Sequence, residues 1–228
     1  MFNQSQNALE RNVTPQSLAI NKVLRNTYIL LSLTLLFSAF TAALSVIRDA
    51  GFVNIWMMLI VMIGFPFLLQ RVKDSPIALP LTFAYTGFIG WYIGPILNMY
   101  ITNFSNGSEL IGMALGGTGL IFLILSMLSI NTTKDYSSWG RFLTIGVIIA
   151  FVASLLNIFL FKLPMMQLGI SVVFSFISGG FIMYQTNAIV RGGERNYVVA
   201  TVVLYISLVN IFLTLLQILG MFGGNRNS

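Results

Sequence analysis

Seven long stretches without Asp, Glu, Lys or Arg dominate the chain, and each contains 20 residues or more. About 20 apolar residues are enough for a helix to cross the hydrocarbon core of a bilayer. Lipid offers no partner to backbone N–H and C=O groups, so each stretch is predicted to be helical. None alternates apolar and polar residues over about ten positions, as the strands of a membrane barrel do. The predicted fold is therefore all-α, an integral membrane bundle of seven transmembrane helices. The predicted spans are Thr27–Ile47, Gly51–Gln70, Ile77–Met99, Leu110–Ile130, Phe142–Phe161, Met165–Val190 and Tyr197–Met221.

Polar segments at the two ends set the domain organisation. Residues 1–26 are interpreted as an N-terminal tail that is partly helical near its end. Residues 27–221 form the transmembrane domain, and residues 222–228 form a short C-terminal tail. The first apolar stretch is longer than the 7–15 residues of a signal-peptide core and six more spans follow it, so it is interpreted as a transmembrane helix rather than a signal.

Lysine and arginine are distributed unequally between the two sides of the predicted bundle. Nine lie on the side of the N-terminus: Arg11, Lys22, Arg25, Arg71, Lys73, Lys134, Arg141, Arg191 and Arg195. Three lie on the other side: Arg48, Lys162 and Arg226. Basic residues accumulate in cytoplasmic loops, so the N-terminus is predicted to be cytoplasmic. With an odd number of spans, the C-terminus is then periplasmic or external.

The composition agrees with a membrane protein and excludes several chemistries. Hydrophobic residues make up 57% of the chain and charged residues only 8%, against about 25% charged in soluble domains. The net charge of +6 comes from the short loops, so nucleic acid is not expected as a partner. The chain contains no cysteine and no histidine, which excludes thiolate nucleophiles, Ser-His-Asp triads and Cys or His metal sites. We therefore predict a protein that is not an enzyme, with no catalytic residue, cofactor or metal.

The third predicted span carries a glycine motif followed by a proline. Gly87, Gly90 and Gly94 recur at i, i+3 and i+7 and so share one helical face, and Pro95 follows directly. Small residues let membrane helices approach closely. Proline removes a backbone donor and is predicted to kink or break the helix. One interpretation is packing within the bundle. The other is a hinge or pathway, because broken helices often mark transport sites.

The fourth span contains a second glycine motif, Gly112 and Gly116 at GxxxG spacing, and the same two interpretations apply to it. The spans contain no ionisable Asp, Glu, Lys or Arg, so the candidate polar residues within them are neutral. The four candidates are Asn98, Gln185, Ser207 and Asn210. They are interpreted either as hydrogen-bonding contacts between helices or as the lining of a substrate path.

Several motifs resemble one known family. Thr86–Leu97 resembles the Gly-Pro-x-Leu part of the signature of the Bax-inhibitor family, and Ala114–Phe122 resembles a later part of it, with Gly119 in place of alanine. The opening Lys22–Tyr28 resembles the bacterial YccA-like branch of that family. So do the later segments Gly192–Tyr197 and Leu204–Phe212.

The resemblance implies a seven-helix bundle in the bacterial inner membrane. For the YccA-like branch it implies a partner, the membrane-bound ATP-dependent protease FtsH, and the tail before Arg25 is a candidate handle for that protease. For the wider family it implies a pH-sensitive calcium leak gated by two aspartates, whose positions fall on Gln185 and Ser207. Neither residue can ionise. The two hypotheses are thus a modulator of FtsH and, as the alternative, a calcium leak channel or transporter. The oligomeric state stays open.

Overall fold

The structure is a computed structural model that describes residues 15–225 of the chain. Within these residues, every element of regular secondary structure is helical. The helices are α2 (Pro15–Ile47), α3 (Ile55–Val72), α4 (Ala78–Asn103), α5 (Gly107–Asn131), α6 (Trp139–Leu156) with the short π-helix η1 (Asn157–Phe161), α7 (Pro164–Val190) and α8 (Tyr197–Gly223). The all-α prediction is confirmed.

Six of these helical segments are long and apolar enough to cross a membrane. The exception among the seven predicted spans is α4, whose sequence is diluted by glycine, threonine and tyrosine. At 26 residues and about 1.5 Å per residue, α4 is nevertheless about as long as its neighbours. Many of the residues that reduce its hydropathy, such as Thr86, Gly87 and Gly90, are buried against other helices.

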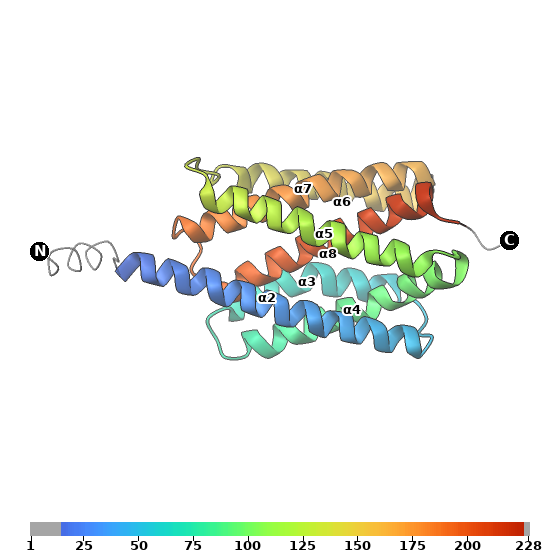
Figure 1. Cartoon of the computed structure of the whole chain (residues 1–228), viewed down its shortest axis with the longest axis horizontal. Coiled ribbons are helices and arrows are strands. Elements are labelled where there is room, and N and C mark those ends of the chain that lie inside the picture. Colours follow the sequence, from blue (N-terminus) through green and yellow to red (C-terminus); the bar gives the residue numbers. More distant parts are fainter. Residues whose placement is uncertain (1–14, 226–228) are drawn as a thin grey trace, which may run out of the picture.

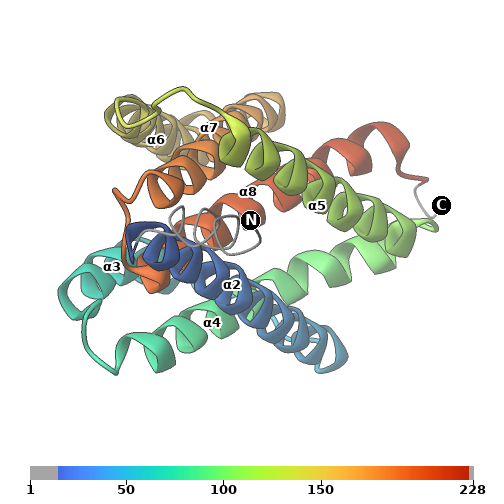
Figure 2. The same ribbon diagram turned by 60° about the vertical axis from the view of Figure 1, so that its left-hand side comes forward.

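Helix α8 occupies the centre of the bundle. It lies between a group formed by α2, α3 and α4 and a group formed by α5, α6 and α7 (Figures 1 and 2). In an apolar stretch of 18 residues, 72% of α8 is buried inside the bundle, whereas only 11% of such a stretch of α3 is buried. It contacts α2, α4, α5 and α7 along its length. Helix α8 therefore supplies much of the core, including Leu204, Tyr205 and Ile211.

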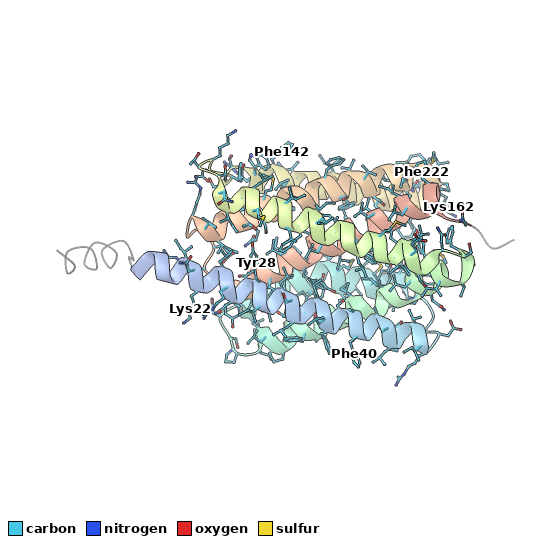
Figure 3. All side chains as sticks on the ribbon, in the orientation of Figure 1. Lys22, Tyr28, Phe40, Phe142, Lys162 and Phe222 are labelled. Atoms are coloured by element: carbon cyan, nitrogen blue, oxygen red, sulfur yellow. The ribbon has the colours of Figure 1, made fainter. Side chains whose placement is uncertain are left out.

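The outer surface is apolar. Phe40 and Phe142 are 59% and 77% exposed, respectively, and they lie on the outside of the bundle, whereas Lys22 and Lys162 lie toward its opposite ends (Figure 3). Water would not stabilise such a surface, but lipid does. The interior instead contains many small hydroxyl side chains, including the fully buried Thr34, Thr82 and Thr86.

The two ends of the bundle differ in charge. One end, called here the basic end, carries the start of α2 together with Arg25, Arg71, Arg141 and Arg191, and the opposite end is called the far end. Helix α2 continues without a break past Asn26, the last residue of the predicted tail. The remainder of that tail, residues 1–14, and the end of the C-terminal tail, residues 226–228, lie outside the described residues. The predicted domain boundaries at residues 26/27 and 221/222 stay predictions.

Loops at each end are held together by asparagine side chains. At the basic end, Asn196 accepts the first amide protons of α8, from Val198 and Val199 at 3.0 and 3.1 Å, and donates to the Lys73 carbonyl at 2.8 Å. At the far end, the Asn106 side chain donates to the Gly223 carbonyl at 2.8 Å. These bonds satisfy backbone groups at helix ends and fix the connections around α8.

Candidate functional site

The glycine motif of α4 forms a tight contact with α2. A methyl group added at Gly90 would lie 2.1 Å from the Ser38 carbonyl oxygen, and one at Gly94 would lie 2.2 Å from the Ser45 hydroxyl. At Gly87 it would lie 2.6 Å from the ring of Phe37. All three glycines therefore face α2, and only a residue without a side chain permits this separation between the two helices.

Of the two effects predicted for Pro95, the break is wrong, because α4 runs from Ala78 to Asn103 as one helix, and the kink stays a prediction. Proline has no N–H, so the carbonyl of Trp91, four residues earlier, loses its usual partner. The Ser45 hydroxyl of α2 donates to that carbonyl at 2.9 Å. A neighbouring helix thus satisfies the group that Pro95 leaves free, as is required in a lipid environment, and the helix continues.

The second glycine motif does not pack within the described bundle. No atom of another described helix lies within 4 Å of a methyl group placed at Gly112 or Gly116. Both glycines are on the exposed side of α5. The interpretation of this pair as packing within the chain is therefore wrong, because the motif faces outward.

The four candidate polar residues occupy different depths of the bundle. Asn98 lies at the far end, where its side-chain amide donates to a carboxylate oxygen of Asp49 at 2.7 Å. Gln185, Ser207 and Asn210 lie on α7 and α8. The structure therefore separates Asn98 from the other three, and no single pathway-lining cluster contains all four.

Helices α7 and α8 are joined by two polar contacts. Asn210 donates to the Ser178 hydroxyl at 3.3 Å, and Thr214 donates to the Ser171 carbonyl at 3.0 Å. Ser207 is buried, but its hydroxyl donates to the Val203 carbonyl of its own helix at 2.8 Å. The contacts made by Asn210 are those expected for interhelical hydrogen bonding, whereas Ser207 does not contribute such a bond.

Gln185 is buried at the α7 side of this interface, with 4% of its surface exposed. The Asn210–Ser178 bond fixes the antiparallel register of the two helices. Ser207 lies three residues before Asn210 on α8, so it is level with Phe181 of α7. Phe181 is four residues from Gln185, which is about one turn, or ~6 Å, along α7. The two side chains form no hydrogen bond with one another within the described residues.

Sequence reasoning missed the best-satisfied polar cluster of the core. Tyr205 is fully buried, and its hydroxyl lies 2.6 Å from that of Ser38 and donates to the Thr86 carbonyl at 3.2 Å. Tyr85 packs edge-to-face against Tyr205 and stacks on Phe65, with ring centroids 3.9 Å apart in the stack. Serine or threonine occurs in six of the seven predicted spans, so the sequence offered no signal that singled out these positions.

A second chain of hydroxyls links three helices nearer the basic end. The Tyr28 hydroxyl lies 2.9 Å from that of Ser126, which in turn lies 3.4 Å from that of Thr186. Within the described residues there is no group of three or more acidic side chains that could hold a metal ion. The buried polar groups are neutral, so this interior is equipped to bind through hydrogen bonds rather than to hold charge.

Comparison with known proteins places the chain in a family. The family model described as "Inhibitor of apoptosis-promoting Bax1" matches residues 20–224, nearly the whole described bundle. The chain belongs to the Bax-inhibitor family. The matched residues include α4, with its Gly94-Pro95 step, and the central α8. The family resemblance seen in the sequence is therefore confirmed.

Bacterial members of this family align with almost the whole chain. "Modulator of FtsH protease YccA" of Escherichia coli strain K12 is 45% identical over 203 residues, which cover 89% of this chain and 91% of that protein. "Inner membrane protein YccA" of Escherichia coli O6:H1 aligns with the same identity and coverage. An "Uncharacterized membrane protein" of Vibrio cholerae is 40% identical over 92% of this chain. Together with its helices, this family membership makes the chain a multi-pass inner-membrane protein.

Proposed function

We propose that this protein binds a membrane-bound ATP-dependent protease of the FtsH type and modulates it, acting in the quality control of membrane proteins. The observation that carries the proposal is the 45% identity over 89% of the chain to a Bax-inhibitor family member named as a modulator of FtsH protease. On this proposal the chain acts as a binding protein rather than as an enzyme.

The orientation is part of the proposal. We place the basic end in the cytoplasm because nine of the twelve Lys and Arg residues lie on that side. The start of α2 projects past the neighbouring helices there (Figure 1). From Pro15 to Asn26 it adds twelve residues, or about 18 Å of helix, outside the predicted span. On this proposal, the start of α2 extends beyond the bundle on the side where the cytoplasmic protease domain would lie.

The calcium-leak alternative has no observation in its favour here. The two positions that the resemblance aligns with the family's aspartates, Gln185 and Ser207, cannot ionise, and the structure sets them about one helical turn apart. Calcium flux into proteoliposomes that contain the purified protein is the direct measurement of this alternative. Flux above that of empty vesicles at acid or neutral pH would support it.

Reconstitution tests the main proposal. Purified FtsH is placed in proteoliposomes with this protein, or with an unrelated polytopic protein at the same density, and the degradation of a membrane-embedded substrate is followed. We expect slower degradation with this protein and co-purification of the two from mild detergent. Equal rates with both additions and no co-purification would contradict the proposal. Deletion of residues 2–20 tests whether the tail is the handle by which FtsH degrades this protein itself. If it is, the shortened protein persists longer than the full chain in the presence of FtsH.

A further inference from the structure

Two buried polar atoms near the basic end have no hydrogen-bond partner among the described residues. They are the Thr27 hydroxyl oxygen on α2 and the side-chain amide nitrogen of Gln185 on α7. Thr27 is fully buried, and Gln185 is 96% buried. Leaving such groups unpaired costs free energy, so a small ligand that pairs with both would stabilise the fold.

The two residues lie at a similar depth along α8. Thr201 of α8 donates to the Thr27 carbonyl at 3.2 Å, which places Thr27 beside this part of α8. The register of α7 on α8 places Gln185 level with Val203, only two residues further along. Two residues correspond to about 3 Å along a helix axis. Thr27 and Gln185 therefore lie in the same layer of the bundle.

The residues next in sequence confirm that these parts of α2 and α7 lie close together. Tyr28 follows Thr27, Thr186 follows Gln185, and the hydroxyl of Ser126 lies within 3.4 Å of the hydroxyls of both Tyr28 and Thr186. Helices α2 and α7 also contact each other directly. One small molecule, or a short chain of them, can thus span the two unpaired groups.

An open groove lies directly above this layer at the basic end. Its volume is about 390 Å³, which is ample for several water molecules. Val23 lines the groove and lies four residues before Thr27, on the same face of α2. The groove is lined by Ala19, Ile20, Val23, Gly192, Glu194 and Arg195. Along α2, Val23 is about one helical turn, or ~6 Å, from Thr27, so the groove ends about one turn above the layer of the two unpaired groups.

We propose that water enters through this groove and occupies a buried site in which it bridges the Thr27 hydroxyl and the Gln185 amide. The Gln185 nitrogen donates to the water oxygen, and the Thr27 hydroxyl completes the pairing. The ligand is neutral because the predicted spans contain no Asp, Glu, Lys or Arg that could balance the charge of a buried cation or anion. The site is a hydrated vestibule at one end of the bundle. It does not depend on the protease proposal.

Thermal unfolding of the detergent-purified protein distinguishes a shared bridging water from two polar groups that are simply unpaired. A bridging water predicts that Thr27→Val and Gln185→Met each lower Tm, and that the double variant loses less than the sum of the two. Two groups that are simply unpaired predict the opposite, since each substitution would then remove a desolvation cost and raise Tm. Additive losses would also overturn the proposal, because they show two independent sites. The control is Thr34→Val, a fully buried threonine of the same helix whose hydroxyl already bonds the Leu30 and Leu31 carbonyls at 2.9 Å.

Thiol labelling measures hydration directly and does not depend on stability. The chain contains no cysteine, so a single Thr27→Cys substitution introduces the only thiol. The reacting species is the thiolate, which forms readily only where water reaches the sulfur. With methyl methanethiosulfonate as the probe, we expect Thr27→Cys to react at least about tenfold faster than Thr34→Cys, which lies two turns deeper. Equal rates for the two variants would overturn the proposal even if both fold normally.

Discussion

Replacement of Ser45 by alanine tests whether α2 compensates for the proline in α4. Ser45 is fully buried, and its hydroxyl donates at 2.9 Å to the Trp91 carbonyl that Pro95 leaves without a backbone partner. Alanine removes the donor and changes little else. The carbonyl is then buried and unpaired, which costs about 1–3 kcal/mol. For a chain of this size that corresponds to a drop in Tm of about 2–12 °C.

The double-mutant cycle with Pro95→Ala makes the reasoning specific. Alanine at position 95 restores the N–H that bonds the Trp91 carbonyl, so the Ser45 hydroxyl becomes dispensable. In the proline background, we expect Ser45→Ala to lower the free energy of unfolding by about 1–3 kcal/mol. In the alanine background, we expect almost no change. Ser32→Ala is the matched control, because Ser32 is exposed on the same helix and bonds only the Tyr28 carbonyl of that helix.

The assay is thermal unfolding in mild detergent, followed by intrinsic tryptophan fluorescence, for the four proteins of the cycle and the control. An equal loss for Ser45→Ala in the two backgrounds would refute the reasoning, because Ser45 would then stabilise the fold by packing alone. A gain in stability in the proline background would refute it more strongly, since it would mean that the carbonyl finds another partner.

Three further predictions follow from the contacts described above. Gly90→Ala should lower stability by more than about 2 kcal/mol because the added methyl overlaps α2, whereas Gly116→Ala should be neutral or raise stability by up to about 1 kcal/mol through helix propensity; Tm values of the two variants check this contrast. Tyr205→Phe should lower the free energy of unfolding by about 1–2 kcal/mol, because it leaves Ser38 without its partner. The same assay measures this loss, and the loss should largely disappear in a Ser38→Ala background. The Ser137 N–H and hydroxyl groups hold the pKa of Asp135 below its ordinary value. That stabilising effect exists above the ordinary pKa and disappears as the pH falls, so Asp135→Asn should slightly lower Tm at pH 7 and leave it unchanged near pH 2.

The number and approximate ends of the helices could be predicted because the bilayer imposes a length on every span. The predicted span Tyr197–Met221 compares with α8 at Tyr197–Gly223, and Thr27–Ile47 ends where α2 ends. The sequence could not show that α2 begins as early as Pro15, because hydropathy marks where a helix enters lipid and not where its hydrogen bonds begin.

Which face of each helix packs inward could not be predicted from the same sequence. Lipid is as apolar as a protein core, so burial leaves little imprint on the pattern of apolar residues. Gly90 and Gly116 illustrate this. Both belong to motifs of small residues at helical spacing, yet Gly90 lies against α2 and Gly116 faces outward. Only the three-dimensional arrangement distinguishes them.

The prediction of a break at Pro95 was wrong for a related reason. A proline's effect on a helix depends on whether the freed carbonyl finds another donor, and that donor is Ser45, 50 residues earlier in the chain. Likewise, Gln185 and Asn98 look alike as neutral polar residues in apolar runs. Their different roles follow from depth and neighbours, since Asn98 pairs with Asp49 at the far end and Gln185 is buried near the basic end.

The distribution of satisfied polar groups favours a binding role over a transmembrane path. A continuous path would need polar groups available to a solute at every depth. In the middle of the bundle they are engaged with one another, as in the Tyr205–Ser38 and Asn210–Ser178 pairs. The unpaired groups, on Thr27 and Gln185, lie near the basic end, beneath the groove. Water that reaches this layer meets a core in which the polar atoms already have partners. The interior is therefore organised to hold the helices in one arrangement, which suits a protein that presents a fixed surface to a partner.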